Sequence, residues 1–192
     1  MRIIAGVHRG RALASVGAGD AGAHLRPTTD RVRENLFNML TGGRFGDPVR
    51  NARVLDLFAG TGALGLEALS RGAARVTFVD SGRKAQSLIR ENIARLGVWG
   101  ETHLMACDAR RLPDNPGQPF DLVFLDPPYG RGLGQAALRA AVSGGWAAAD
   151  ALVVWEENAP QDAPPGFRSM ERRRYGETWI TVLRQAGGDG LP

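Results

Sequence analysis

The chain has 192 residues, a length that suits one domain with a sizeable hydrophobic core. Hydrophobic residues make up 43% of it, which excludes a disordered chain, and no run approaches the ~18 apolar residues of a membrane span. The single cysteine, Cys107, excludes an internal disulfide, and three scattered histidines give no metal-ligand spacing. No long apolar signal segment follows Met1, so we expect a cytoplasmic protein with no metal ion and no membrane partner.

The net charge of +4 is unevenly distributed along the chain. Residues 1–53 contain nine arginines and four acidic residues, a net charge of +5, which leaves about −1 for the remainder. A basic N-terminal lobe on a near-neutral body indicates a polyanionic partner such as nucleic acid. The alternative is that arginine merely replaces lysine, since Lys84 is the only lysine, but replacement does not explain the clustering.

The first fifty residues predict a small extension. Residues 1–14 contain two short apolar runs around a basic sequence at residues 8–11, which predicts a hairpin with a basic tip. Residues 15–26 are rich in glycine and alanine, which is typical of a loop. A helix is expected to start shortly after Pro27, with Thr29 or Asp30 as its cap, and to be ended by two glycines at residues 42 and 43. Its apolar stripe is formed by Val32, Leu36, Met39 and Leu40.

From Arg53 onward, strands and helices alternate. This pattern predicts an α/β fold, in which a doubly wound, mostly parallel sheet is covered on both faces. The last two strands, at 168–175 and 178–183, flank a tight turn and predict an antiparallel C-terminal hairpin that completes seven strands. We expect an extension at 1–50, a catalytic body at 51–184 and a frayed tail at 185–192, together one compact domain. The other strands are expected at 54–58, 75–79, 102–106, 122–125 and 152–155, and the helices at 63–70, 83–96 and 135–142.

A glycine-rich run, residues 60–65, connects the first strand of the alternation to its helix. Its G-x-G-x-x-G spacing lets Gly60 form a tight turn, Gly62 admit a ligand close to the backbone, and Gly65 pack the helix against the sheet. Asp80 ends the second strand twenty residues later, where a carboxylate can bind ribose hydroxyls. The combination indicates an adenosine-containing cofactor. A Walker A phosphate loop is excluded, because no Gly-Lys-Ser/Thr sequence follows.

Acidic residues at strand ends favour one adenosine cofactor over another. Asp56 lies in the first strand near the glycine turn, where its charge would repel a pyrophosphate but attract an ammonium or a sulfonium group. Asp56, Asp80, Asp108 and Asp126 all lie at or beside the carboxyl ends of parallel strands, where doubly wound folds bind ligands. S-adenosyl-L-methionine therefore fits better than NAD. Each acid could instead be a helix cap, and Asp108 is the most suitable for that role.

Residues 126–129, Asp-Pro-Pro-Tyr, follow an apolar strand. The two prolines end that strand, because neither can donate a ladder hydrogen bond, and they stiffen the backbone beyond it. A carboxylate, a carbonyl oxygen and an aromatic ring are thereby fixed at one strand end. This group suits the holding of an exocyclic amino group of a flat base while a group is transferred to its nitrogen. The alternative is an acidic turn without chemistry.

These segments resemble a known family. Residues 56–65, with the acids at 80 and 108 and the 126–129 tetrapeptide, resemble the Rossmann-like class I S-adenosylmethionine-dependent methyltransferases that modify amino groups. Residues 2–13 and 25–40 closely resemble the bacterial 16S rRNA guanine-N2 methyltransferase D family, and the resemblance extends to about residue 183. It implies methylation of one guanine, position 966 in the usual rRNA numbering. It also implies 16S rRNA or the 30S small subunit as the partner; we expect a monomer.

The resemblance implies a role for each candidate residue. Asp126, Pro127 and Tyr129 would be catalytic, with the amino hydrogens bonded to the Asp126 carboxylate and the Pro127 carbonyl while Tyr129 stacks on the base, worth ~1–3 kcal/mol. Pro128 would also contact the base. The N-terminal arginines would bind phosphates, and Arg172, Arg173 and Arg174 form either a second phosphate patch or a solvated edge strand. Cofactor contacts would come from Asp56, Phe58, Gly60, Gly62, Asp80, Ser81, Asp108 and Ala109, and RNA contacts from Arg9, Arg11, Arg26 and Arg33.

Other functions remain open on the residues alone. A DNA amino-methyltransferase acting on adenine N6 or cytosine N4 would share the cofactor site. It would also share residues 126–129, called the clamp below because they are expected to hold the base, although no target-recognition domain is visible. A non-catalytic RNA-binding module and a dehydrogenase are further alternatives. The tetrapeptide does not distinguish guanine from adenine or cytosine; only the resemblance does.

Overall fold

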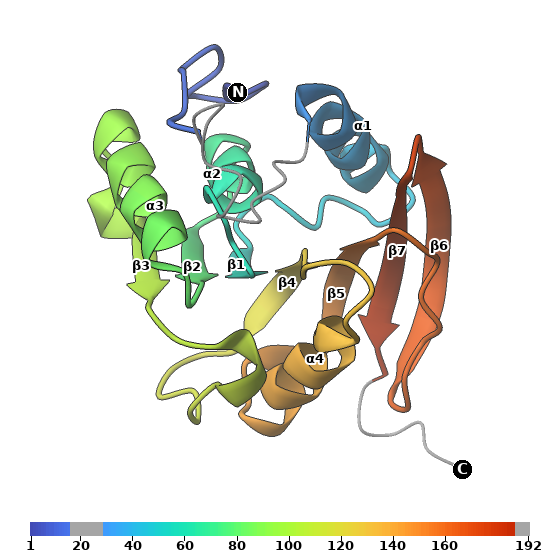
Figure 1. The fold of residues 1–192 in the computed structure, drawn as a ribbon. Helices are drawn as coiled ribbons and strands as arrows, with labels where there is room; N and C mark the ends of the chain where they lie inside the picture. Colours follow the sequence, from blue (N-terminus) through green and yellow to red (C-terminus); the bar gives the residue numbers. More distant parts are fainter. Residues whose placement is uncertain (16–28, 187–192) are drawn as a thin grey trace.

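Seven strands form a single mixed sheet in the computed structural model, which describes residues 1–15 and 29–186 (Figure 1). The strand order is β3-β2-β1-β4-β5-β7-β6. Strands β1 to β5 pair in parallel, whereas β7 pairs antiparallel with both β5 and β6, so the expected doubly wound sheet with a C-terminal hairpin is confirmed. The strands are β1 Arg53–Leu57, β2 Arg75–Val79, β3 Thr102–Met105, β4 Phe120–Leu125, β5 Ala147–Glu157, β6 Phe167–Tyr175 and β7 Thr178–Gln185.

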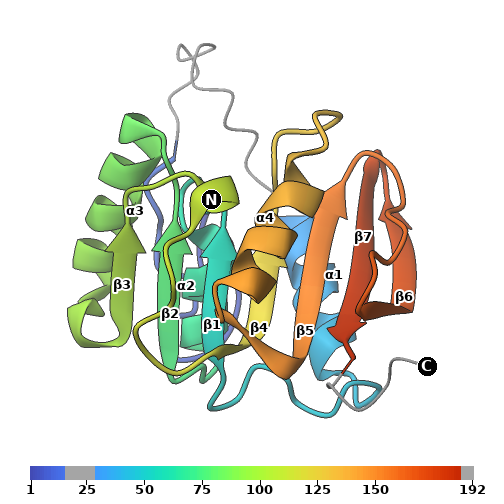
Figure 2. The same ribbon diagram turned by 90° about the horizontal axis from the view of Figure 1, so that it is seen from below.

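Helices cover both faces of the sheet. Figures 1 and 2 show α1, α2 and α3 on one face and α4 on the other. None of the helices within the described residues is long and apolar enough to cross a membrane. The helices are α1 Asp30–Thr41, α2 Ala63–Ser70, α3 Arg83–Leu96 and α4 Leu133–Ser143, with 3₁₀ turns η2 Trp99–Glu101 and η3 Ala109–Arg111.

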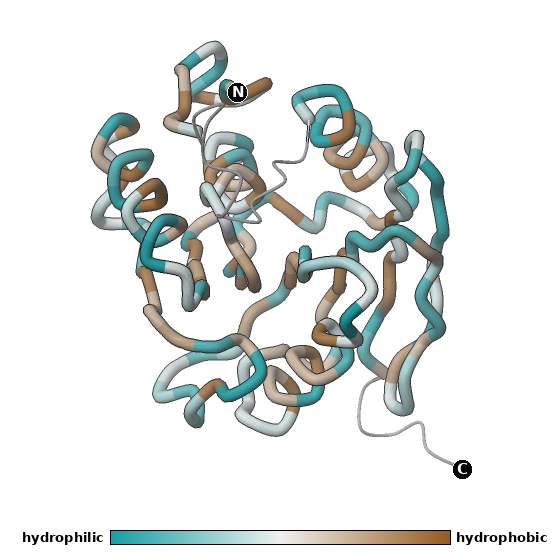
Figure 3. Tube along the Cα trace, in the orientation of Figure 1, coloured by the Kyte–Doolittle hydropathy of each residue, from teal (hydrophilic) through white to brown (hydrophobic). Residues whose placement is uncertain are grey.

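The alternation of side chains along each strand divides the core into two clusters. Val54 and Phe124 point toward α1, α2 and α3, whereas their neighbours Leu55 and Leu125 point toward α4. Both faces of the central strands are therefore apolar, while the outer strand β6 is mostly hydrophilic (Figure 3). A sheet that is buried on both faces holds its strand ends rigidly, which fixes the groups that follow them.

The N-terminal segment packs on α2 as an irregular hairpin. Ile3 N–H donates to Arg11 O at 2.9 Å, and Gly10 N–H donates to Ile3 O at 2.9 Å. Ile3 is fully buried in the same cluster as the apolar side of α1. The basic hairpin expected from the sequence is thus formed, with a single bridge between Arg2 and Ala12 rather than full strands. The division of the chain into units at residues 50 and 184 stays a prediction.

Several element ends differ from the sequence expectation. β5 begins at Ala147 rather than residue 152, because Ala147 pairs with Phe120 despite the low strand propensity of its alanine-rich start. α4 begins two residues early, and Gly134 in its first turn lets the helix lie directly on Trp155. β1 ends at Leu57, because Phe58 takes a positive φ of 59°. The expected loop at 15–26 lies outside the described residues beyond position 15, and the frayed tail lies outside them from residue 187.

Candidate functional site

The carboxyl ends of β1 and β4 lie side by side at the point where the strand order reverses. β1 is followed in space by β2 and β3 in one direction and by β4 in the other. Leu57 pairs with Leu125, and the Asp126 N–H donates to Leu57 O at 3.4 Å. Doubly wound folds bind ligands outside such a switch point. The glycine turn after β1 and the tetrapeptide after β4 therefore border the same place.

The glycine turn adopts left-handed backbone conformations at two positions. Gly60 has a φ of 58° and Gly62 a φ of 76°, which L side chains adopt only at a cost. Phe58, just before them, has a φ of 59° and is half-buried, an uncommon conformation for a bulky residue that recurs at functional sites. The Gly60 N–H donates to Asp80 Oδ2 at 2.9 Å, so the second strand end fixes the turn of the first.

Gly65 and Asp56 join α2 to the sheet. A Cβ on Gly65 would lie 2.5 Å from Phe78 Cε1 and 2.6 Å from Val76 Cγ1, which confirms that this glycine permits close packing of helix on sheet. The Gly65 N–H donates to Asp56 Oδ2 at 2.9 Å. Asp56 is only 1% exposed, and burial raises its pKa to about 8, with a further rise from Asp80 that the Gly65 hydrogen bond opposes. Asp56 thus lies beneath the turn, and its contact with a cofactor stays a prediction.

Asp80 is organised by backbone donors. Its Oδ1 accepts from Gly82 N–H at 2.8 Å and its Oδ2 from Gly60 N–H. Burial raises the pKa of this half-buried carboxyl, and the hydrogen bonds from Gly82 and Gly60 oppose the rise. Each carboxylate oxygen has a second lone pair, so the group can still accept from ribose hydroxyls. Ser81, next along the chain, is exposed at the same edge of the sheet.

Asp108 caps the 3₁₀ turn that follows β3. Its Oδ1 accepts from Arg110 N–H at 2.9 Å, and its carboxylate also forms an ion pair with the Arg110 guanidinium at 2.6 Å. The side-chain hydrogen bonds from Arg110 lower the pKa of Asp108. Asp108 therefore serves as the helix cap that was given as its alternative role. Adenine recognition by its carboxylate stays a prediction. Ala109, its buried neighbour, packs against the α4 side of the sheet.

The tetrapeptide after β4 is anchored at its far end by two acids of β5. The Tyr129 hydroxyl donates to Glu156 Oε1 at 2.9 Å and lies 3.5 Å from Thr178 Oγ1. The Gly130 N–H donates to Glu157 Oε1 at 2.9 Å. Burial, followed by the nearby Glu156 charge, raises the pKa of Tyr129 above its ordinary value, so the phenol keeps its proton. The ring and the backbone of the clamp are thus held in one place.

Glu156 and Glu157 are functional candidates that the sequence reasoning missed. They are 5% and 6% exposed and are the last two residues of β5, directly after its buried apolar stretch at 151–155. The sequence contains a signal that could have identified them, because acids at the carboxyl end of a buried strand repeat the pattern of Asp80 and Asp126. Within the tetrapeptide, Asp126 is partly exposed, Pro127 is buried and Pro128 is exposed. Among the described residues, no group of three or more His, Cys, Asp or Glu side chains is placed to hold a metal ion.

The four arginines expected to contact RNA lie in different surroundings. Arg9 and Arg11 are exposed on the N-terminal hairpin, and Arg11 also donates to Arg95 O at 2.6 Å. Arg26 lies outside the described residues. Arg33 does not fit the expected phosphate contact, because its side chain is fully buried.

Arg33 instead joins α1 to α2. Its Nε lies 3.6 Å from Glu67 Oε2, and its Nη2 donates to Asp30 Oδ1 at 3.0 Å and to Arg2 O. The role expected for Arg33 is therefore corrected to a structural one. The sequence contains a signal for this burial, because Arg33 lies on the inward face of α1. The buried residues of the helix are spaced i, i+3, i+4, i+7: Arg33, Leu36, Phe37 and Leu40.

Comparison with known proteins gives consistent matches along almost the whole chain. A protein-family model described as "Conserved hypothetical protein 95" matches residues 1–184. The "Ribosomal RNA small subunit methyltransferase D" of Escherichia coli K12 is 38% identical over 99% of this chain and 92% of its own length. The protein of the same name from Haemophilus influenzae is 34% identical over 92% of this chain and 89% of its own. The solved Escherichia coli yhhF structure superposes with a TM-score of 0.81 at 35% identity, covering 97% of this chain and 98% of that one.

The match spans the N-terminal hairpin, the glycine turn and the Asp126–Tyr129 clamp alike. Because both the family model and relatives above 30% identity cover nearly all of the sequence, the similarity is not confined to the fold. The chain belongs to the ribosomal RNA small subunit methyltransferase D family, the group that the matching family model describes as conserved hypothetical protein 95.

Proposed function

We propose that this protein transfers a methyl group from S-adenosyl-L-methionine to the exocyclic N2 amino group of guanine 966 in the 16S rRNA of the small ribosomal subunit. The observation that carries the proposal is the juxtaposition at the switch point. The Asp126 backbone bonds to Leu57, the last residue of β1, and the glycine turn begins three residues later, so clamp and turn meet at adjacent strand ends. The names of the relatives point to rRNA as the substrate.

The residues present suit the cofactor. Gly60 and Gly62 give the turn its two positive φ angles, Gly60 is partly exposed, and the Asp80 carboxylate has free lone pairs toward which ribose hydroxyls can donate. Asp56 is buried beneath the turn with a pKa raised to about 8, and the positive charge of a bound methionine end would favour its ionised form, whereas a pyrophosphate would not. Ser81, Asp108 and Ala109 border the position proposed for the adenosine. When bound, the cofactor supplies a methyl group on a sulfonium, an electrophile that needs no metal.

The clamp supplies the geometry that an amino nucleophile needs. The N2 lone pair of guanine is delocalised into the ring, so the nitrogen must become tetrahedral before it can attack. Its two hydrogens can bond to the Asp126 carboxylate and the Pro127 carbonyl, which aims the lone pair at the methyl carbon. The bond to the carboxylate strengthens as positive charge develops on nitrogen, which stabilises the transition state more than the ground state. After the transfer the cationic nitrogen is strongly acidic and would lose one of its two protons to Asp126 or to water. Tyr129, held by Glu156, would stack on the base while Pro128 borders it.

The rest of the molecule fits an RNA partner. Arg9 and Arg11 are exposed on the hairpin beside α2, where they can contact phosphates. The guanine must leave its stack to reach the clamp, at a cost of a few kcal/mol that is lowest in a loop. We extend the proposal to a cytoplasmic enzyme that acts as a monomer; charged residues on the outer strand β6 oppose edge-to-edge pairing of copies.

The deciding experiment uses small subunits that lack the modification. Purified protein and labelled cofactor should label the 16S rRNA, and primer extension should place the new methyl group at one guanine. A protein that binds the cofactor but labels no subunit would refute the proposal. Labelling of duplex DNA at adenine N6 or cytosine N4, with none of the subunits, would assign it to the DNA amino-methyltransferases.

A further inference from the structure

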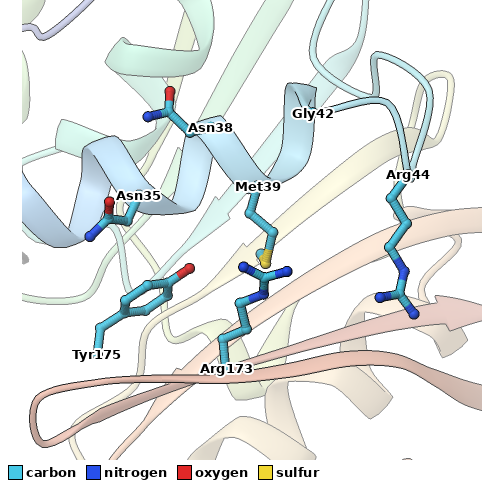
Figure 4. A pocket seen from close by; sticks show the side chains of 7 residues that line it. All are labelled: Asn35, Asn38, Met39, Gly42, Arg44, Arg173 and Tyr175. Carbon is cyan, nitrogen blue, oxygen red and sulfur yellow. The ribbon is translucent and has the colours of Figure 1, made fainter.

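A groove of about 410 Å³ lies between α1 and the C-terminal hairpin (Figure 4). Its volume falls within the ~300–1,000 Å³ that is typical of ligand sites. Two asparagines of α1, Asn35 and Asn38, line one wall, while Arg173 and Tyr175 of β6 line the other and Arg44 closes one end. Small-molecule sites are mostly apolar, whereas this groove is lined by two amides, two guanidinium groups and one aromatic ring, with Met39 and Gly42 completing the lining. That composition suits a nucleotide better than an apolar ligand.

The side-chain alternation of β6 singles out one of its three consecutive arginines. Arg173 and Tyr175 pair with Ile180 and Thr178 of β7 and point to the face that carries α1. Arg172 and Arg174 point to the other face; Arg172 pairs with Asp162 at 2.8 Å. Only one of the three guanidinium groups therefore enters the groove.

The groove carries a net positive charge. Arg44 and Arg173 have side chains that are 60% and 51% exposed, and both lie next to one carboxylate, Glu171. Glu171 Oε1 is 3.6 Å from Arg173 Nε, and Arg44 also donates to Met170 O at 3.0 Å. Each guanidinium has five N–H donors, so donors remain for an anion after these contacts. The carboxylate holds the two cations in place without neutralising both.

The opposite wall offers groups that recognise a base. Asn35 and Asn38 are three residues apart on α1 and so lie on one side of the helix, where each amide can both donate and accept. The Tyr175 ring is half-buried, because it packs on the core cluster beneath α1 while it lines the groove. An aromatic ring that is fixed on one side presents its remaining surface for stacking.

The groove begins beside the clamp. Tyr175 is the β6 partner of Thr178, and the Thr178 hydroxyl lies 3.5 Å from the hydroxyl of Tyr129. We propose that the groove binds an unpaired RNA nucleotide that flanks the target base, with its phosphate on Arg173 and Arg44 and its base against Tyr175. This inference rests on the proposed function and names a second contact of the same substrate.

The test measures binding of wild-type protein and two variants to unmethylated small subunits at several salt concentrations. R173Q removes the charge in the groove, and R174Q removes an identical charge from the opposite face of the same strand. R173Q should weaken subunit binding by at least five-fold and lower the salt slope by about 0.7, the value for one phosphate of single-stranded RNA. R174Q should match wild type. Thermal unfolding and cofactor binding should be unchanged in both.

Two further measurements complete the test. Y175F, which keeps the ring, should bind subunits like wild type, whereas Y175L should bind several-fold more weakly at equal cofactor affinity. Equal binding by R173Q and R174Q, or a weakened R173Q whose salt slope is unchanged, would overturn the groove proposal. Methyl transfer by wild type is scored separately: its absence would refute the proposed function, while the R173Q and R174Q comparison would still decide the groove.

Discussion

Asp126 combines a charge with a fixed position. Its N–H bonds to the end of β1, its carboxylate is partly exposed, and the prolines that follow cannot extend the strand. Asp56, seventy residues earlier, differs from Asp126 in its exposure, because it is buried and accepts a hydrogen bond from Gly65 at the start of α2. Burial rather than sequence context separates a group that can touch a substrate from one that supports the site.

The first prediction concerns the charge of Asp126. D126N keeps the size of the side chain but removes the negative charge that stabilises the developing cation, so kcat should fall by about 100-fold or more. The cofactor Kd should change by less than about two-fold, because the carboxylate acts on the base. D121N is the matched control at the other end of β4, where Asp121 accepts from Arg53 N–H, and it should keep normal turnover. A near-normal rate in D126N would refute the role proposed for the Asp126 charge in catalysis.

The second prediction concerns the pKa of Asp56. Because that pKa is raised from 3.8 to about 8, the folded protein retains a proton between these pH values that the unfolded chain has released. The contribution of Asp56 to stability is therefore present at low pH and is lost as the pH rises toward 8. The free energy of unfolding should fall by at most about 1.4 kcal/mol for each pH unit in this range.

D56N removes this titration. Urea unfolding of cofactor-free protein at pH 5, 6, 7 and 8 should show the variant gaining stability relative to wild type as the pH rises. Parallel pH profiles for the two proteins would show that Asp56 titrates normally.

At the scale of elements, α2 is fixed by the absence of a side chain. Gly65 lies over Phe78 and Val76 of β2, and the close contact puts the start of α2 within hydrogen-bonding distance of Asp56. The clamp is fixed in a different way, by Glu156 and Glu157 at the end of β5. Each of these two segments of the candidate site is thus a strand end that is held by a neighbouring element.

The third prediction follows from that contact. G65A would place a Cβ 2.5 Å from Phe78, so we expect a loss of about 1–3 kcal/mol in the free energy of unfolding from overpacking. Weaker cofactor binding should accompany the loss, since the turn before α2 must shift. G100A is the control, because no atom lies within 4 Å of its Cβ. Equal stability of G65A and G100A in urea would contradict the packing argument.

At the scale of the whole molecule, one buried acid connects the N-terminal hairpin, α1 and α2. Glu67 accepts from Ile4 N–H at 2.8 Å and Ala5 N–H at 3.1 Å, and it pairs with both Arg33 and Arg71. The basic hairpin that carries Arg9 and Arg11 is thereby attached to the catalytic body through a group with no exposed surface.

The fourth prediction tests this connection. E67Q removes the buried one of the two acids that pair with the buried Arg33 charge and leaves the partly exposed Asp30, which should cost up to about 3–5 kcal/mol in the free energy of unfolding. Trypsin should also cleave faster at Arg9 and Arg11, because the hairpin is less firmly attached. E91Q, which removes the acid of the exposed ion pair between Glu91 and Arg95, should cost less than about 1 kcal/mol. Similar losses in the two variants would show that Glu67 has no special role.

The sequence by itself determined the order of elements, the glycine turn and the clamp. These follow from local rules: hydrophobic periodicity, prolines that end a strand, and glycines where the backbone needs a positive φ. The seven strands and four helices within the described residues all fall where that periodicity expects them, with shifts at their ends. The family also followed from local segments, because its motifs are contiguous in the chain.

Only the tertiary structure decided which charged residues are available. Arg33 and Arg9 are the same residue type in the same basic segment, yet one is fully buried against Glu67 and the other is exposed. Glu156, Glu157 and Arg173 acquire their positions from pairings between β5, β6, β7 and the clamp. Burial and charge pairing depend on contacts between residues far apart in the chain, and no local pattern encodes those contacts completely.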